Sequence, residues 1–580
     1  MKKNTLKVVL WACALLVVIL AFALPKSTWT YLVELVLSGA IMGILAFNAK
    51  DKNNAIKVIL IAFVGLMLLS WVIPAAYYSG EYVNQGRAQM GLFDMFNYPL
   101  TALSYFGYIT LFIILVGGFY GVLYKIPAYR SFLDKIVNAF QGKEMVLLSI
   151  MVILTALLVS FCGLHIGIAV FIPFMVALIL MMGYDKITAA LVTVGGISAG
   201  LIGTTFANSN ISVLLQSLSL KIGYGLGVRF VILLAAIAVV IFNVIVYAKR
   251  NVSNVKVVKK EEKKEKVVEV KEVKASTTKK TTKTTKSSKK STSKKSGKTT
   301  KKNNNKAALK DGKVIVLTEN ETVETDSMYI PKGSNTKHSV WPFVVSFILL
   351  LVLVVLAYVS WDAEGIGIKF FTDITKSVTT YELFKFPIFG KLLGTVNAFG
   401  AWTITDMFVP LALIVLLLSF IYKVSFEEVL DGFVSGAKKA LGPAAISILI
   451  YGILVLVTYH PFQLVIYDTL LSFNKGFNVL TTTIIAILAS LFNSDIAYTF
   501  QSVLPYYVTK VTNLKDFSIV GVIFTSMYGL TALVAPTSLV LMGTLAYLKV
   551  SYKDWLKNVW KLLVELFVIL LIVFIIMALV

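Results

Sequence analysis

Residues 203–210 read GTTFANSN and residues 492–500 read FNSDIAYTF, two polar segments inside stretches that are otherwise strongly apolar. Backbone that leaves the helix at membrane depth persists only where protein or a water-filled cavity satisfies its N–H and C=O groups. Polar interruptions of apolar spans are therefore typical of a transport site. One such interruption lies in each half of the chain.

The composition indicates an integral membrane protein. The chain has 580 residues, of which 57% are hydrophobic, whereas soluble domains are about 45–50% apolar. A hydrocarbon core of ~30 Å requires about 20 apolar residues per helix. On that basis the sequence predicts an all-α polytopic fold with about eleven transmembrane helices and two re-entrant helical hairpins. Both cysteines, Cys13 and Cys162, lie inside apolar spans, which excludes a disulfide framework and gives no metal-ligand spacing.

The net charge of +25 is concentrated in one segment. Residues 249–340 hold 26 lysines and arginines against 10 acidic residues and so account for +16 of that charge. The Lys/Thr/Ser-rich centre cannot bury enough apolar surface to offset its ordering entropy, so we predict a disordered cytoplasmic loop. Its lysines can contact anionic lipid headgroups, and the lack of interleaved aromatic residues disfavours nucleic acid. A plain solvated linker is the alternative.

The basic loop separates two membrane halves, residues 1–248 and 341–580. Lysine and arginine are more frequent at 48–57 and 124–144 than at 76–97, so the positive-inside rule places residues 76–97 outside. The loops at 48–57 and 124–144 are then cytoplasmic, as is the N-terminus.

The order of parts within 98–248, namely a span, a polar tip, an interrupted span and a closing span, recurs within 442–580. The parity of the spans places the first tip on the cytoplasmic side and the second outside, which predicts an inverted repeat with interrupted helices. The first tip, SFCGLHIG at 160–167, belongs either to a re-entrant hairpin or to two full spans. We expect residues 426–440 to form an amphipathic surface segment ahead of a separate span at 442–460.

Small polar residues gather at the first interruption and at the first tip. Hydroxyl, amide and freed carbonyl oxygens bind a sodium ion or a polar solute without a buried charge. Holding helices together is the alternative use of such residues. A histidine at the tip can bind an anionic solute, carry a coupling proton, or stay neutral and hydrogen-bond to backbone. The candidate site residues are Thr204, Thr205, Asn208, Ser209, Asn210 and His165.

The second tip holds Asp495, the one acidic residue within either tip or interrupted span. An intramembrane carboxylate is expensive, so by default its partner is a cation, a proton or a cationic solute group. The alternative is a helix cap at interfacial water, with the N–H groups of Tyr498 and Thr499 in reach. In the second interrupted span, proline removes a donor and frees a carbonyl, so a break is expected there. The remaining candidates are Asn493, Ser494, Thr531, Pro536, Thr537 and Ser538.

Four segments carry a family resemblance. They read GLFDMF (91–96), FIILVGGFYGVLYK (112–125), GYDKITAALVTVGGISAGLIGTT (183–205) and APTSLVLMGTLAYLKVSYKDWLK (535–557). In this order they resemble the YfcC group of the four-carbon-dicarboxylate anaerobic carrier family, within the ion transporter superfamily. The resemblance implies a secondary transporter of dicarboxylates or basic amino acids, with two hairpins and two interrupted helices meeting near the bilayer midplane. At the first tip the group tends to have a Glu pair after a Gly, where this chain reads GLHIG.

Together these features predict a multi-pass protein of the cytoplasmic membrane that moves a small polar organic solute, a carboxylate or an amino acid, by alternating access. Sodium or a proton is the expected coupling ion, and no other cofactor is expected. We do not expect an enzyme, because nothing orients His165 as a base for Cys162. The alternative, motivated by the missing Glu pair, is a transport-incompetent relative that anchors the basic loop as an interaction module. Symport or antiport, and monomer or homodimer, stay open.

Overall fold

The structure is a computed structural model that describes residues 11–13, 19, 28–48, 54–86, 88–275, 328–331, 338–363, 366–474 and 476–579. The apolar stretch at 7–25, which is the first of the eleven predicted spans, and the Lys/Thr/Ser-rich centre of the basic loop lie largely outside these residues. Both therefore stay predictions.

The described residues of the first membrane half are helical apart from one small β-hairpin. Its elements are α2 (Thr28–Asn48), α3 (Asn54–Val72), β1 (Ala75–Tyr78), β2 (Tyr82–Gly86), α4 (Asp94–Leu123), α5 (Pro127–Ala139), α6 (Glu144–Cys162), the 3-10 helix η1 (Gly167–Val170), α7 (Ile172–Met181), α8 (Lys186–Ile202), α9 (Asn208–Ser217) and α10 (Leu226–Ala275). The two strands pair antiparallel, with Tyr78 opposite Tyr82.

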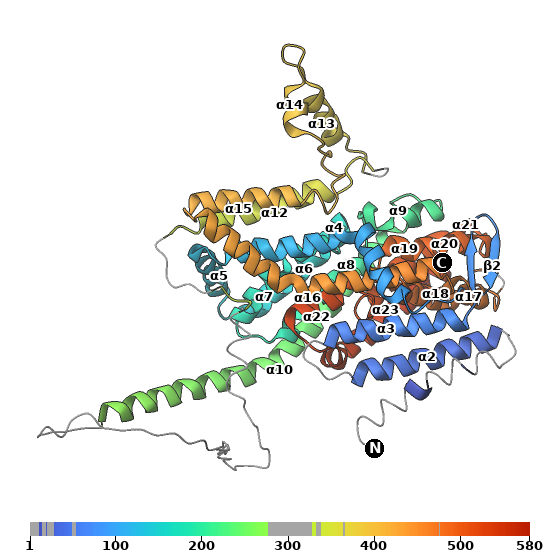
Figure 1. Cartoon of the computed structure of the whole chain (residues 1–580), viewed down its shortest axis with the longest axis horizontal. Coiled ribbons are helices and arrows are strands. Elements are labelled where there is room, and N and C mark those ends of the chain that lie inside the picture. Colours follow the sequence, from blue (N-terminus) through green and yellow to red (C-terminus); the bar gives the residue numbers. More distant parts are fainter. Residues whose placement is uncertain are drawn as a thin grey trace, which may run out of the picture.

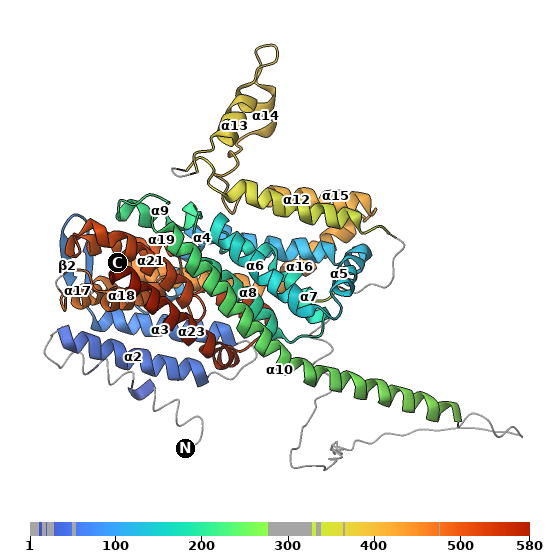
Figure 2. The ribbon, with the colours of Figure 1, turned by 180° about the vertical axis from the view of Figure 1, so that it is seen from behind.

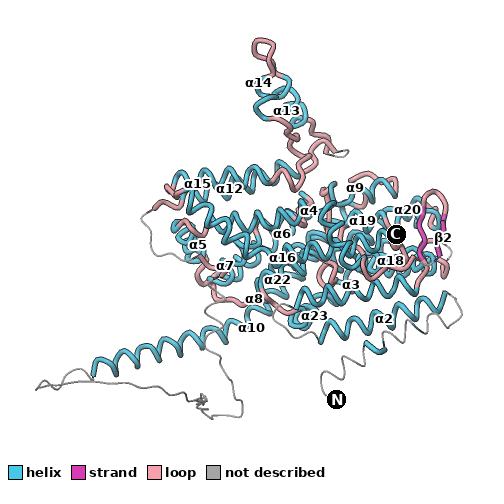
Figure 3. The backbone as a smooth tube through the Cα atoms, in the orientation of Figure 1, coloured by secondary structure: helices cyan, strands magenta, loops and turns pink. Residues whose placement is uncertain are grey.

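The second membrane half repeats this helical character (Figure 3). Its elements are α12 (Trp341–Tyr358), α13 (Phe370–Thr380), α14 (Ile388–Leu393), α15 (Phe408–Ile421), α16 (Phe426–Tyr459), α17 (Gln463–Leu471), α18 (Val479–Phe492), α19 (Ile496–Gln501), α20 (Leu504–Lys510), α21 (Leu514–Thr531), α22 (Leu539–Leu548) and α23 (Tyr552–Leu579).

Seven of the described helices are long and apolar enough to cross a membrane: α3, α4, α6, the first 26 residues of α10, α12, α16 and α23. Shorter apolar helices of 10–17 residues include α7, α8, α15, α18 and α22. The prediction of an all-α polytopic membrane protein is confirmed. The eleven predicted spans included two interrupted ones, at 187–220 and 518–548, and the structure divides both into shorter helices. Within the described ranges, the apolar helix at 33–45 and α15, with 14 residues, are also shorter than a full span.

The expected boundary between a surface segment at 426–440 and a span at 442–460 is wrong. The structure has one continuous helix of 34 residues, α16, with Pro443 inside it. Its small residues pack against glycines of α4, so closely that a Cβ on Gly121 would lie 2.1 Å from the Gly432 carbonyl oxygen. Close approach through small residues is a common way to join membrane helices. The polar segment is therefore the first part of α16 and is held by α4.

Several long helices, among them α2, α3 and α12, run close to the horizontal axis of Figure 1. The β1–β2 hairpin and α20 lie at one end of this axis, and α5 and α7 lie at the other. Following the predicted topology, we call these the outer end and the inner end. Helix α10 extends beyond the body at the inner end, and the view from behind shows it crossing the molecule diagonally (Figure 2).

Candidate functional site

The first polar tip joins two limbs of a helical hairpin. Helix α6 ends at Cys162, and Gly163 follows in the left-handed conformation, with φ of 72°. A side chain there would meet Ser209, whose Oγ lies 2.2 Å from the ideal Cβ position. The returning helix α7 has 10 residues, about 15 Å at 1.5 Å per residue. Because that is roughly half of a ~30 Å core, the geometry favours a re-entrant hairpin over two full spans.

The first interruption separates α8 from α9 and is fastened to α6. The Ser160 hydroxyl donates to the Gly203 carbonyl at 2.6 Å. In return, the Ser160 carbonyl accepts from the backbone N–H groups of Thr205 and Ala207 at 3.1 and 3.2 Å. These bonds satisfy backbone groups that the broken helix leaves open, as burial of polar backbone requires.

The two predicted threonines use their hydroxyls within this framework. Thr204 Oγ1 donates to the Leu201 carbonyl at 2.8 Å, and Thr205 Oγ1 lies 3.0 Å from Ser160 Oγ. Both side chains are fully buried. For these two positions the structural reading, in which polar residues hold helices together, fits better than direct solute contact.

The tip histidine and the start of α9 form a polar pair. His165 Nδ1 lies 3.0 Å from Asn210 Oδ1 and 3.2 Å from the Gly163 carbonyl oxygen. Within the described part of the chain, two atoms of this pair are buried without a hydrogen-bond partner, His165 Nε2 and Asn210 Nδ2. Buried polar atoms normally have partners, so this pair is suited to a polar ligand. Ser209 is exposed beside the tip, and the side chain of Asn208 lies outside the described residues.

Arg229, near the start of α10, was missed by the sequence reasoning. Its side chain is 1% exposed, and its guanidinium lies 4.1 Å from the ring centroid of Tyr224. Nη1 donates to the Thr204 carbonyl at 3.2 Å, and Nη2 donates to the Ile222 carbonyl. No carboxylate pairs with it among the residues described. The available signal was an arginine inside an apolar span, which marks a functional position by default.

The second tip is tied to the helix before its hairpin. Asn493 Nδ2 donates to the Ala489 carbonyl at 3.0 Å and reaches Ser502 Oγ at 3.3 Å and Gln463 Oε1 at 3.4 Å. The neighbouring Ser494 Oγ is buried and has no partner in the described ranges. As at the first tip, a buried polar atom is left for a ligand.

Asp495 caps α19, and several tyrosines lie within the range of its charge. Its Oδ1 accepts from the N–H groups of Ala497 and Tyr498 at 2.9 and 3.3 Å. The cap that the sequence offered as an alternative therefore exists, although Ala497 takes the place expected for Thr499. Its charge also acts on four nearby tyrosines, Tyr108, Tyr451, Tyr498 and Tyr528.

The second interruption separates α21, which ends at Thr531, from α22. Pro536 lies inside this break, as the sequence predicts. Thr537 Oγ1 donates to the Leu491 carbonyl of α18 at 2.9 Å, and Ser538 Oγ caps α22. The predicted residues at this break thus hold the interruption against the second hairpin.

Helix α23 supplies the remaining donors for the second break. Trp555 Nε1 donates to the Leu533 carbonyl at 2.8 Å, and the Tyr552 hydroxyl donates to the Val534 carbonyl. Both freed carbonyls therefore have neutral donors.

The two interrupted helices meet where each one breaks. A Cβ on Gly529 would lie 2.3 Å from the backbone nitrogen of Ile202, so only glycine permits this approach. Ser526 Oγ donates to the Ile202 carbonyl at 2.9 Å. Helix α19 of the second hairpin also packs against α9. The structure therefore brings both halves of the predicted site together.

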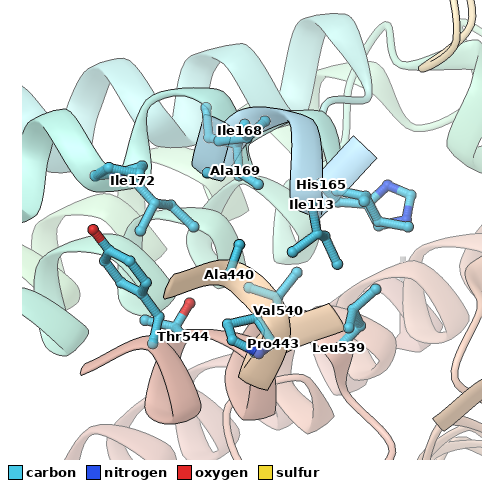
Figure 4. Close-up of a pocket in the computed structure, with 16 residues that line it drawn as sticks. Ile113, His165, Ile168, Ala169, Ile172, Ala440, Pro443, Leu539, Val540 and Thr544 are labelled. Carbon is cyan, nitrogen blue, oxygen red and sulfur yellow. The ribbon is translucent and has the colours of Figure 1, made fainter. Parts of the chain in front are cut away.

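Cavities approach this region from both ends. An outer cavity of ≈ 220 Å³ is lined by residues that include Tyr78, Gln463, Asn493 and Ser502. A tip cavity of ≈ 90 Å³ lies between the first hairpin and α22 and includes His165, Leu539 and Thr544 (Figure 4). An entry cavity of ≈ 370 Å³ shares Pro443 with the tip cavity and is lined partly by Lys438, Lys439 and Lys549.

Comparison with known proteins supports the resemblance. The family model described as DcuC, C4-dicarboxylate anaerobic carrier, matches residues 53–287 and 308–579. A search of curated proteins gave no match. The family match does not separate subgroups, so the YfcC-like assignment stays a prediction. The match covers most of the chain, which therefore belongs to the C4-dicarboxylate anaerobic carrier family.

Proposed function

We propose that the protein is a secondary active transporter that moves a small organic carboxylate across the cytoplasmic membrane by alternating access. The observation that carries the proposal is a pair of cavities, one toward the outer end and one toward the inner end of the place where the two interrupted helices meet. The outer cavity reaches Asn493 at the second tip, whereas the tip cavity reaches His165 at the first. A site between two such cavities is open to one side at a time if the hairpins move alternately.

Positive charge at the entry cavity and at the first break supports a carboxylate. Three lysines, Lys438, Lys439 and Lys549, contribute to the entry cavity, and Arg229 lies at the first break. Lined by one sign of charge, a cleft raises the local concentration of oppositely charged solute. The family description, a carrier of C4-dicarboxylates, points the same way.

An amino acid is the second solute class that the site fits. Asp495 with its tyrosines, including the buried hydroxyl of Tyr451, offers a carboxylate and aromatic faces to an ammonium group. Its carboxylate would instead hold a sodium ion or a proton if the solute has no positive charge. Coupling to one of these ions is part of the proposal.

The test is uptake by the purified full-length protein in liposomes. Radiolabelled succinate, alanine and lysine are supplied with a sodium gradient, a proton gradient or no gradient. We expect gradient-dependent accumulation of at least one solute. Absence of accumulation for every solute and gradient, in protein that remains folded, would refute the proposal.

A matched pair of glycine substitutions assigns the uptake to the tip. Gly163→Ala adds a methyl group at a left-handed residue in contact with Ser209, so the tip has to shift and uptake should fall. Gly39→Ala in α2 adds the same group where nothing lies within 4 Å, so uptake should be unchanged.

A further inference from the structure

The wall of the tip cavity is almost entirely hydrocarbon. Figure 4 shows α22 on one side of the cavity and the first hairpin on the other, with α4 and α16 closing the space between them. The apolar residues labelled there are Ile113, Ile168, Ala169, Ile172, Ala440, Pro443, Leu539 and Val540. In contrast, the outer and entry cavities have polar or charged residues among their linings. The tip cavity is therefore the apolar compartment of the proposed site.

Thr544 and Tyr547 each bring a hydroxyl-bearing side chain to this wall, and Thr544 is the one whose hydroxyl lacks a partner among the described residues. A threonine in a helix usually donates to the carbonyl three or four residues earlier. The Thr544 side chain is 3% exposed, yet its Oγ1 has no hydrogen-bond partner among the described residues. A buried polar atom without a partner is costly, so this hydroxyl indicates a ligand that brings a partner to it.

Charge limits what this cavity accepts. None of the described residues that line it is a lysine or an arginine. A second carboxylate placed here would lose its water without gaining a cation, which is strongly unfavourable. A carboxylate can be placed at one end of the cavity only, beside His165. Nδ1 of this histidine faces the Gly163 carbonyl oxygen and so carries a proton, and the buried Nε2, unpartnered within the described chain, donates to a carboxylate when the ring is an imidazolium.

We propose that the tip cavity holds the uncharged arm of an organic monocarboxylate. The arm is a short branched or cyclic hydrocarbon, and its carboxylate lies at the first tip. Thr544 pairs with a hydroxyl or keto oxygen carried by the arm. This inference rests on the proposed carboxylate transport and narrows its substrate class to acids with one charged end.

The size of the cavity agrees with such an arm. Its volume of ≈ 90 Å³ lies between the ~10–15 Å³ that one water needs and the ~150 Å³ of an apolar cavity that binds benzene. A branched group of about three to five carbon atoms lies within these limits.

The experiment compares probes that share one carboxylate and differ in the arm. Acetate, 3-methylbutanoate, 3-hydroxybutanoate and succinate are titrated against purified full-length protein, with binding read from the shift in thermal unfolding. We expect both four- and five-carbon monocarboxylates to bind at least tenfold more tightly than acetate, and succinate to bind less tightly than either.

Two substitutions in α22 test the apolar wall and the Thr544 hydroxyl separately. Gly543→Leu fills the cavity, since only Leu539 Cδ1 comes within 4 Å of the added Cβ, at 3.8 Å. It should weaken both larger monocarboxylates at least fivefold and leave acetate unchanged. Thr544→Val keeps the shape and removes the hydroxyl, so it should raise the preference for 3-methylbutanoate over 3-hydroxybutanoate at least threefold. A purely structural role for Thr544 would change both affinities equally.

The controls separate this inference from the proposed function. Gly39→Leu adds the same side chain to α2, where nothing lies within 4 Å, and should leave the affinity for every acid unchanged. Gly543→Ala replaces Gly543→Leu if the larger variant does not fold. Uptake of succinate with no effect of Gly543→Leu on any monocarboxylate would overturn the inference and leave carboxylate transport standing. A lipid chain is the alternative occupant. It would be identified, and the inference overturned, if the thermal stability of the wild type depended on lipid chain length, that of Gly543→Leu did not, and the affinities for the acids were the same in both proteins. Absence of uptake for all acids would refute transport, while the binding series still tests the cavity.

Discussion

In the first half, Arg229 of α10 donates to the freed carbonyl of Thr204; in the second half, Trp555 of α23 donates to the freed carbonyl of Leu533. Each donor lies on the helix that follows the interrupted one. Broken helices at membrane depth need such donors because no water is present to take their place. The donor therefore occupies the same position in both halves, but it is a charged guanidinium in the first half and a neutral indole in the second.

The difference gives the site an electrical polarity. Burying a guanidinium without a carboxylate partner costs several kcal/mol, and Arg229 offsets that cost with carbonyl oxygens and the face of Tyr224. Asp495 places a negative group at the second tip. Charges in a poorly polarisable interior act over longer distances than in water. Hence the first half is suited to anionic groups and the second to cationic ones.

Removal of the charged donor should have the largest effect. Arg229→Met leaves the carbonyls of Thr204 and Ile222 without donors, at about 1–3 kcal/mol each. We expect the initial uptake rate to fall at least ~30-fold, since each 1.4 kcal/mol corresponds to tenfold. Arg229→Lys keeps the charge but cannot reach both carbonyls with a planar fork, so it should recover only part of the rate.

The lysine variant decides between geometry and charge. Full recovery of uptake in Arg229→Lys would show that the charge alone matters and that the two carbonyl contacts are incidental. Wild-type uptake in Arg229→Met would show that the charged donor at the first break is not needed for transport.

Neutralising the second tip should have the next largest effect. Asp495→Asn keeps the helix cap, because Asn and Asp are equally good caps, and removes the charge. We expect uptake to fall at least about tenfold and to depend less on the coupling gradient, because the partner cation is lost. Uptake is measured in liposomes over a range of sodium concentrations and of pH.

A second aspartate cap provides the control. Asp185 caps α8 by accepting from the N–H of Thr188, and Asp185→Asn should leave uptake within about twofold because the cap is kept. Equal losses for Asp185→Asn and Asp495→Asn would mean that the charge at the second tip has no special role.

Removal of a neutral donor should have a smaller effect. Trp555→Phe keeps most of the buried ring and leaves the Leu533 carbonyl without its indole donor. We expect the free energy of unfolding to drop by about 1–3 kcal/mol and uptake to change by only a few-fold. Thermal unfolding and uptake are measured together. A loss of uptake as large as that of Arg229→Met would show that the charge of the donor is not what separates the two breaks.

Replacement of the segment between the halves should have the smallest effect. Exchanging residues 255–308 for a neutral Gly/Ser linker removes most of the lysine-rich sequence. We expect uptake within about twofold and weaker binding to anionic vesicles, since each lysine near a surface contributes ~1 kcal/mol. Complete loss of uptake in a chain that inserts normally would favour the reading in which the membrane part anchors this loop.

Much of the architecture follows from local patterns in the sequence. Long apolar stretches predict the spans, and polar residues at 203–210 and 493–495 predict the interruption and the tip that the structure contains. Pro536 predicts the second break because proline cannot donate to a helical hydrogen bond. The prediction of a separate surface segment at 426–440 was wrong, because its polar residues suggested solvent exposure. Its glycines pack against α4, and the local sequence does not indicate that contact.

Tertiary structure alone decided what each polar side chain does. Sequence reasoning placed Thr205 and Thr537 at the site, and the fold directs their hydroxyls to Ser160 and Leu491. The role of Arg229 depends on a carbonyl 25 residues earlier in the chain. Periodicity and composition indicate whether a residue lies in an apolar or a polar environment. They do not distinguish lipid from protein interior, because both are equally apolar. A hydrogen bond depends on distance and direction between particular atoms, and these are set only when the halves pack together.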